Sequence, residues 1–148
     1  MSPFERWTVH LSNLLVGGTG LVYAFMLYAL EPIDEFSVLH HPLQGTVQHL
    51  HVLVAPLLVF AAGLIFREHI WFGFRQGGPS GRRSGLTLLG TLVPMIASGY
   101  LLQTATDDTW RRVWVAVHVG ASAAWLLGYL AHWVAKVKRG VERPTRWS

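Results

Sequence analysis

Four long stretches without a single Asp, Glu, Lys or Arg constrain the fold of this chain most strongly. A soluble helix carries charged residues along its outer face, and these stretches carry none. Once its ends are included, each stretch approaches the roughly 20 residues that cross the hydrocarbon core of a bilayer. The sequence therefore predicts an all-α integral membrane protein whose spans are built on Leu14–Leu30, Val52–Phe66, Leu86–Leu102 and Val113–Ala135.

The composition agrees with lipid as the solvent, because 51% of the 148 residues are hydrophobic and 14% are charged. We expect one transmembrane domain over residues 1–148. Short polar connections, including the Gly-rich segment 76–84, favour antiparallel neighbours in an up-down-up-down four-helix bundle. The first apolar stretch is longer than the apolar region of a signal peptide, so we expect a retained span. The predicted spans are about 7–30, 43–68, 86–103 and 110–137.

The basic residues indicate how the bundle is oriented. Ten of the twelve fall in three regions that a four-span protein places on one side of the membrane. The positive-inside rule then puts both termini in the cytoplasm. This placement explains the pI near 10 without a nucleic-acid partner. The ten residues are Arg6, Arg67, Arg75, Arg82, Arg83, Lys136, Lys138, Arg139, Arg143 and Arg146.

Histidine is the residue type that points to chemistry. The chain has eight histidines and no cysteine, which excludes iron–sulfur clusters, thiolate metal sites and covalently attached c-type haem. Ionisable residues inside a span are costly and usually functional. Imidazole is a good ligand for haem iron, and helical bundles hold cofactors between side chains of facing helices.

His118 and His132 share one face of the fourth span. They are fourteen positions apart, which is about 21 Å along a helix and about 40° around it. Ser122, Trp125 and Tyr129 lie on the same face between them. One helix can therefore supply a ligand to each of two stacked haems.

Each iron needs a second axial ligand from another helix. At the cytoplasmic level, His10 in the first span pairs with His132 in our preferred scheme. His69 is an alternative partner for His132, because it follows His51 by five helical turns and shares its face. In the other reading, His69 lies at the headgroup level and bonds a haem propionate or a quinone.

At the outer level the candidate partners of His118 are His49 and His51, early in the second span. They differ by about 200° around the helix, so only one can face the bundle. We favour His51, because Ala55 one turn later offers clearance.

Several glycines in the first and third spans allow two readings. They suit close contact between helices, and equally they leave room for a flat macrocycle. The sequence leaves both open for Gly17, Gly18, Gly20, Gly90 and Gly99.

Together these residues resemble a known family. The start of the first span, Arg6–His10 (RWTVH) followed by Gly17–Gly20 (GGTG), is similar to the Arg-x-x-x-His and downstream Thr-Gly of bacterial four-helix di-haem cytochromes b. This family includes the haem b membrane subunits of formate dehydrogenases and hydrogenases. His118 and His132 resemble its paired ligands, and Ser98–Tyr100 resembles part of its ligand-free third helix.

The resemblance, which covers Trp7 to Trp133, implies two bis-histidine haems b that carry electrons without binding substrate at iron. It implies the quinone pool and a cytochrome or dehydrogenase subunit as redox partners, and the bacterial inner membrane as the location. We expect an electron-transfer subunit of an oxidoreductase. Arg111 and Arg112 on the outer side, with Arg6 and Arg67 on the inner side, are placed to pair with haem propionates.

A quinone site and two other functions stay open at this point. A quinone could bind near His10 or His69 on the inner side, or near His40 and His41 in the outer loop, which we expect at the surface. The first alternative function is a stand-alone membrane quinone oxidoreductase of the same fold, taking electrons from a small donor such as superoxide. The second is a haem-free anchor, assembly factor or histidine-lined metal carrier.

Overall fold

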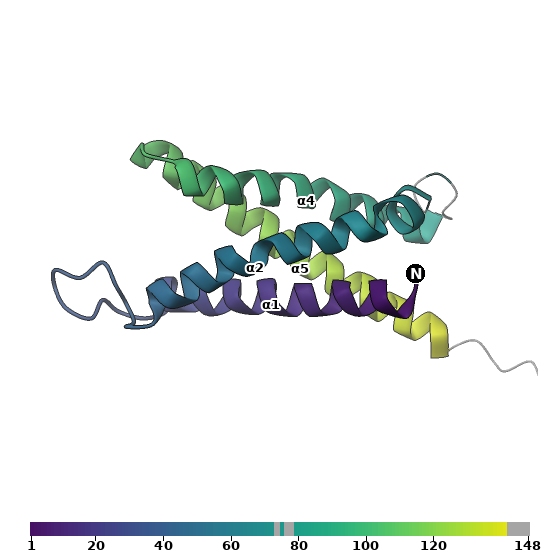
Figure 1. The fold of residues 1–148 in the computed structure, drawn as a ribbon, viewed down its shortest axis with the longest axis horizontal. Coiled ribbons are helices and arrows are strands. Elements are labelled where there is room, and N and C mark those ends of the chain that lie inside the picture. Colours follow the sequence, from purple (N-terminus) through teal and green to yellow (C-terminus); the bar gives the residue numbers. More distant parts are fainter. Residues whose placement is uncertain (73–74, 76–78, 142–148) are drawn as a thin grey trace, which may run out of the picture. The chain divides into compact units, whose positions relative to one another are not determined.

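The chain is helical throughout its long segments. A computed structural model describes residues 1–72, 75 and 79–141, and no strand occurs among them. The helices are α1 (Pro3–Tyr28), α2 (Gln44–Ile65) with a π-helical continuation η1 (Phe66–Trp71), α4 (Pro79–Thr104) and α5 (Asp108–Val141), as drawn in Figure 1.

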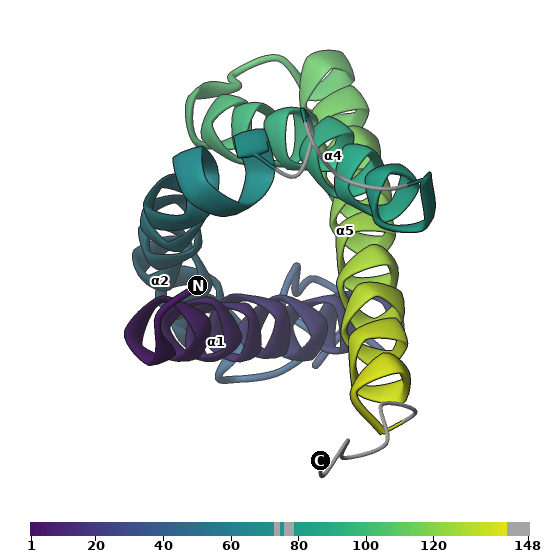
Figure 2. The same ribbon diagram turned by 90° about the vertical axis from the view of Figure 1, so that its right-hand side faces the viewer.

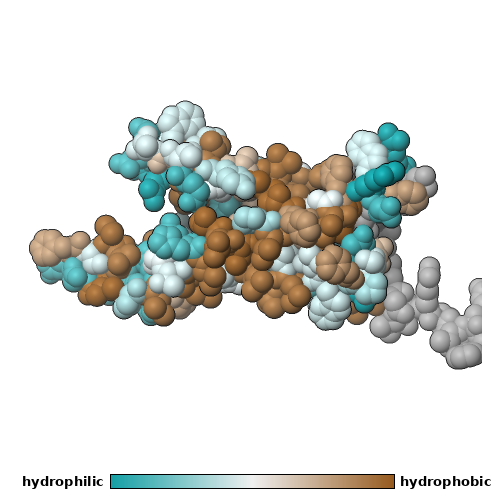
Figure 3. Space-filling model, viewed as in Figure 1, coloured by the Kyte–Doolittle hydropathy of each residue, from teal (hydrophilic) through white to brown (hydrophobic). Residues whose placement is uncertain are grey.

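All four long helices are long and apolar enough to cross a membrane. The candidate spans are Pro3–Tyr28, Gln44–Glu68, Gly85–Thr104 and Asp108–Lys138. Large apolar side chains in their middle parts are exposed, for example Leu14, Leu53 and Leu127. On the face drawn in Figure 3, hydrophobic residues gather over the middle of the helices. Such a surface suits lipid rather than water, as the sequence predicts.

The chain divides into two units, residues 1–69 and 70–148, and each is built on a pair of helices. In the first unit α1 packs against α2, and in the second α4 packs against α5. Both views show these helices side by side (Figures 1 and 2). Gly99 meets His118 and Gly128 meets Leu88, so α4 and α5 run antiparallel. We call the two pairs the first and second hairpin.

The first helix begins earlier than the span predicted from Trp7. Ser2 is its N-cap: the Ser2 hydroxyl accepts a hydrogen bond from the Glu5 backbone N–H, and the Glu5 carboxylate accepts one from the Ser2 N–H. Pro3 occupies the first turn, where no backbone N–H is needed. This capping box starts the helix before the apolar stretch begins.

In the second hairpin, too, the helices begin earlier than the sequence predicts. Residues 79–84, expected as part of a turn, belong to α4, with Pro79 at its start; residues 76–78 of that turn lie outside the described part. Helix α5 begins at Asp108, slightly before the predicted start of the fourth span near residue 110, and Asp107 caps it. The Asp107 Oδ1 accepts the backbone N–H groups of Thr109 and Trp110 at 3.0 Å each. A carboxylate at this position satisfies N–H groups that have no partner within the helix.

The second span continues beyond α2 into irregular helix. After Ile65 the backbone widens into the π-helix η1, which carries Arg67 and Glu68. Beyond it, the guanidinium carbon of Arg75 lies 4.8 Å from the centroid of the Trp71 ring, a cation–π contact. The change to π-helix therefore falls where the apolar stretch gives way to charged residues.

Candidate functional site

His118 is held between the two helices of the second hairpin. It projects from α5 toward α4, where its Nδ1 lies 3.0 Å from the Met95 carbonyl oxygen and 3.2 Å from the Ser98 hydroxyl oxygen. Ser98 is 1% exposed. A buried hydroxyl has to be hydrogen-bonded, and this one donates to the Pro94 carbonyl at 2.6 Å. Its lone pairs then face the imidazole.

His51 is held in the same way in the first hairpin. It projects from α2 toward α1, where its Nδ1 lies 3.1 Å from the Thr19 hydroxyl oxygen. Thr19 also uses its hydroxyl hydrogen within its own helix, with the Leu15 carbonyl at 2.7 Å and the Val16 carbonyl at 3.1 Å. Each hairpin thus has one histidine whose Nδ1 meets a hydroxyl from the neighbouring helix.

These contacts determine which ring nitrogen carries the proton. The Met95 carbonyl can only accept, so Nδ1 of His118 is the N–H donor. The Thr19 hydroxyl hydrogen is committed to a helix carbonyl, so the Thr19 oxygen accepts from Nδ1 of His51. When each ring is neutral, its lone pair is therefore on Nε2, the tautomer that binds a metal through Nε2.

A glycine makes room for each of these rings. A Cβ atom added at Gly20 would lie 2.9 Å from Cε1 of His51, and one added at Gly99 would lie 3.2 Å from Cε1 of His118. Gly18 and Gly90 would meet nothing within 4 Å. The sequence left open whether these glycines permit close contact between helices or leave room for a macrocycle. Gly20 and Gly99 do permit close contact, and the group they contact is the imidazole ring of the neighbouring helix.

The other candidate histidines differ in their surroundings. His49 is exposed, while His10 and His132 are half-buried. The His10 ring lies edge-on to Trp7, with 6.3 Å between ring centroids. The backbone of His69 belongs to η1, and its side chain lies outside the described part of the chain. His51, and not the exposed His49, is thus held against α1. The choice of His51 over His49 as a ligand stays a prediction, as does the choice between His10 and His69.

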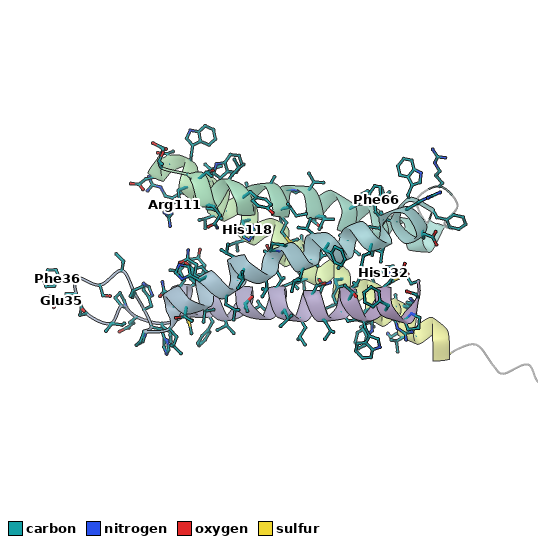
Figure 4. The ribbon with its side chains drawn as sticks, viewed as in Figure 1. Glu35, Phe36, Phe66, Arg111, His118 and His132 are labelled. Carbon is teal, nitrogen blue, oxygen red and sulfur yellow. The ribbon has the colours of Figure 1, made fainter. Side chains whose placement is uncertain are left out.

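Each hairpin places its histidines at two levels. His118 and His132 are separated along α5 (Figure 4), by about 21 Å at the rise of an α-helix. In the first hairpin His51 lies beside Gly20, ten residues or about 15 Å along α1 from His10. The predicted axial pairs, His10 with His132 and His51 with His118, each take one residue from either hairpin and stay predictions.

The arginines predicted to pair with propionates lie near helix ends. Arg6 is in the first turns of α1, and Arg67 is in η1. Arg111 and Arg112 are in the first two turns of α5 (Arg111 is labelled in Figure 4). All four side chains are exposed. At these positions the guanidinium groups could pair with an anionic group at the membrane interface, either a haem propionate or a lipid headgroup.

His40 and His41 are half-buried and help to order the loop between α1 and α2 rather than lying fully at the surface. His40 donates from Nδ1 to the Leu30 carbonyl at 2.7 Å, and its backbone N–H donates to Gln44 Oε1 at 2.8 Å. His41 Nδ1 accepts the Leu43 backbone N–H at 3.1 Å. These bonds connect the end of α1 to the start of α2.

The sequence did not identify the residues that hold the two imidazoles. Thr19, Ser98 and the Met95 carbonyl were missed, and the third span was expected only to resemble a ligand-free helix. One signal was present: a hydroxyl residue precedes a glycine both in Thr19-Gly20 and in Ser98-Gly99. The dipeptide offers a hydroxyl acceptor beside a gap large enough for a ring.

Comparison with protein-family models, with curated proteins and with solved structures gave no match for this chain. Within the residues that the structure describes, no group of three or more His, Cys, Asp or Glu side chains could hold a metal ion. Haem iron makes a smaller demand on a protein, because the porphyrin supplies four ligands and two histidines complete the set.

Proposed function

We propose that this protein is a di-haem b-type cytochrome subunit of the bacterial inner membrane that transfers electrons between the quinone pool and a redox partner protein. In this proposal the two hairpins form an up-down-up-down bundle with both termini in the cytoplasm. His118 and His51 bind one haem, and His132 and His10 bind the other. The proposal extends the sequence resemblance to the di-haem cytochromes b.

The observation that carries the proposal is the way His51 and His118 are held. Each ring lies against a glycine of the neighbouring helix, with Nδ1 bonded to a hydroxyl oxygen. Metal-binding histidines in proteins commonly donate their second ring N–H to such an acceptor, which fixes the ring and leaves Nε2 for the metal. A buried histidine that only fills space also needs a hydrogen-bond partner, but it does not need a glycine opposite its ring. Here the two features occur together in both hairpins.

The number of cofactors follows from the two histidine levels. In the second hairpin His118 and His132 lie about 21 Å apart along α5. In the first hairpin the levels of His10 and His51 lie about 15 Å apart along α1. A single haem cannot take ligands from levels so far apart, so we expect two. When bound, haem b supplies a carrier that accepts and releases one electron at a time.

The chain's own residues would perform binding, orientation and insulation. The four histidines would hold the haem iron, and the hydroxyls of Thr19 and Ser98 would orient the imidazoles at one level. Lipid around the exposed apolar faces excludes water, and arginines near the helix ends meet the propionates. Residues of the outer loop and of the cytoplasmic ends remain for contacts with partner and quinone.

The visible spectrum of the detergent-solubilised, dithionite-reduced protein tests the proposal. We expect the absorption of b-type haem and two haems per chain by quantitative extraction. One haem per chain would remove either the His10–His132 or the His51–His118 pair. A protein purified without haem, and unable to take up added hemin, would overturn the proposal and favour an anchor or assembly role.

A further inference from the structure

The hydroxyl groups of Thr19 and Ser98 do more than fill space beside the candidate ligands. We propose that they are positioning residues that hold Nδ1 of His51 and His118 as hydrogen-bond donors and thereby lower the reduction potential at that haem level. This inference rests on the proposed function. It assigns a tuning role to the third span, α4, which supplies no ligand of its own.

Helix geometry makes both hydroxyls acceptors. Each residue donates its only hydroxyl hydrogen to a carbonyl of the preceding turn, at 2.7 Å from Thr19 to Leu15 and 2.6 Å from Ser98 to Pro94. The oxygen therefore has only lone pairs for the imidazole. Because neither hydroxyl can turn and donate to Nδ1 without breaking that bond, the direction of both hydrogen bonds is fixed.

An acceptor at Nδ1 changes the ligand electronically. Donation of the Nδ1–H raises the electron density of the ring, and Nε2 becomes the more basic ligand. A more basic ligand stabilises ferric over ferrous iron, so the reduction potential falls. Hydrogen bonds at both axial histidines of one level would act in the same direction and set this level apart from the other.

The backbone supports the same arrangement. Gly20 follows Thr19 and Gly99 follows Ser98, and their missing Cβ atoms let each ring approach the neighbouring helix. In the second hairpin the Met95 carbonyl adds a second acceptor to Nδ1 of His118. Removal of the Ser98 hydroxyl therefore leaves the tautomer of His118 unchanged, and its effect reports on hydrogen-bond strength.

Redox titration of the purified holoprotein, followed by its visible spectrum, tests the inference with Thr19→Val and Ser98→Ala. We expect two haems per chain in each variant and an upward shift of one of the two midpoint potentials, the same one in both. Thr91→Val on α4 is the matched control, because Thr91 makes the same bond to a helix carbonyl, at 2.9 Å to Thr87. It should move neither potential.

Each outcome decides the question. Unchanged potentials with two haems retained would overturn the inference and leave the proposed function intact, whereas absence of haem from the unaltered protein would overturn the proposed function itself. If Thr19→Val loses a haem, Thr19→Ser restores the hydroxyl on a smaller side chain. Recovery of haem and potential in Thr19→Ser supports the inference, and failure to recover assigns Thr19 a packing role and overturns it.

Discussion

A histidine inside an apolar helix has three possible states, two neutral tautomers and a cation, and its neighbours restrict the choice. For His51 and His118 the neighbours are oxygen atoms whose own hydrogen is used elsewhere or that have none. Such acceptors exclude the tautomer that has no proton on Nδ1. For a residue that the sequence marks only as a possible ligand, the structure thus shows which helix the ring faces and that Nδ1 is its hydrogen-bond donor.

His49 and His51 provide a direct test at this scale. We expect His51→Ala to lose one of two haems, because it removes the imidazole held against Gly20, whereas His49→Ala should keep both, because His49 is exposed. The haem content per chain, measured after extraction, checks this. Loss of haem from His49→Ala alone would reverse the assignment.

Gly20 gives a second prediction. In Gly20→Ala the new methyl group would lie 2.9 Å from Cε1 of His51, closer than two carbon atoms can approach, so the ring must move away from Thr19. We expect weaker haem retention during purification, or a changed spectrum of one haem. Gly18→Ala is the control, because its methyl group meets nothing within 4 Å, and an equal effect there would attribute the loss to the helix rather than to the ring.

At the scale of the element, the polar ends of the helices decide where each begins. The sequence places the apolar middles well, but it puts the starts of the first and fourth spans a few residues after Pro3 and Asp108, where α1 and α5 begin. Hydropathy changes gradually at a membrane interface, while a cap depends on individual side-chain oxygens. Ser2 with Glu5, and Asp107, are such caps.

Removal of the Asp107 cap should be measurable. Asp107→Ala leaves the N–H groups of Thr109 and Trp110 without their carboxylate partner, and we expect a loss of about 1 kcal/mol in the free energy of unfolding. Asp107→Asn retains a capping oxygen and should behave like the unaltered protein. Unfolding in detergent by denaturant measures both, and equal stability of the Ala and Asn variants would contradict the prediction.

At the scale of the whole molecule, charge decides orientation. The proposal places the loop after α1 outside and the segment after η1 in the cytoplasm, since basic residues gather on the latter side. The loop after α1 carries Phe36 and Val38, which are 95% and 84% exposed. Figure 4 shows Phe36 beside Glu35 at the tip of this loop. This loop is therefore an accessible reporter of the side on which it lies.

The orientation can be tested because the chain has no cysteine of its own. In right-side-out membrane vesicles we expect Val38→Cys to react with a membrane-impermeant maleimide. Arg75→Cys should react only after the membrane is permeabilised. The opposite pattern would place both termini outside and invert the proposed direction of the two haem levels.

The sequence by itself determined the membrane class, the four apolar helices and the levels at which histidines occur, because these depend on residue type and on distance along a helix. The tertiary structure decided which helix faces meet. Spans that are apolar on all sides carry little information about which side faces a neighbour. The bonds from Thr19 to His51 and from Ser98 to His118 join residues 32 and 20 positions apart, so they exist only once the register of each hairpin is set by packing.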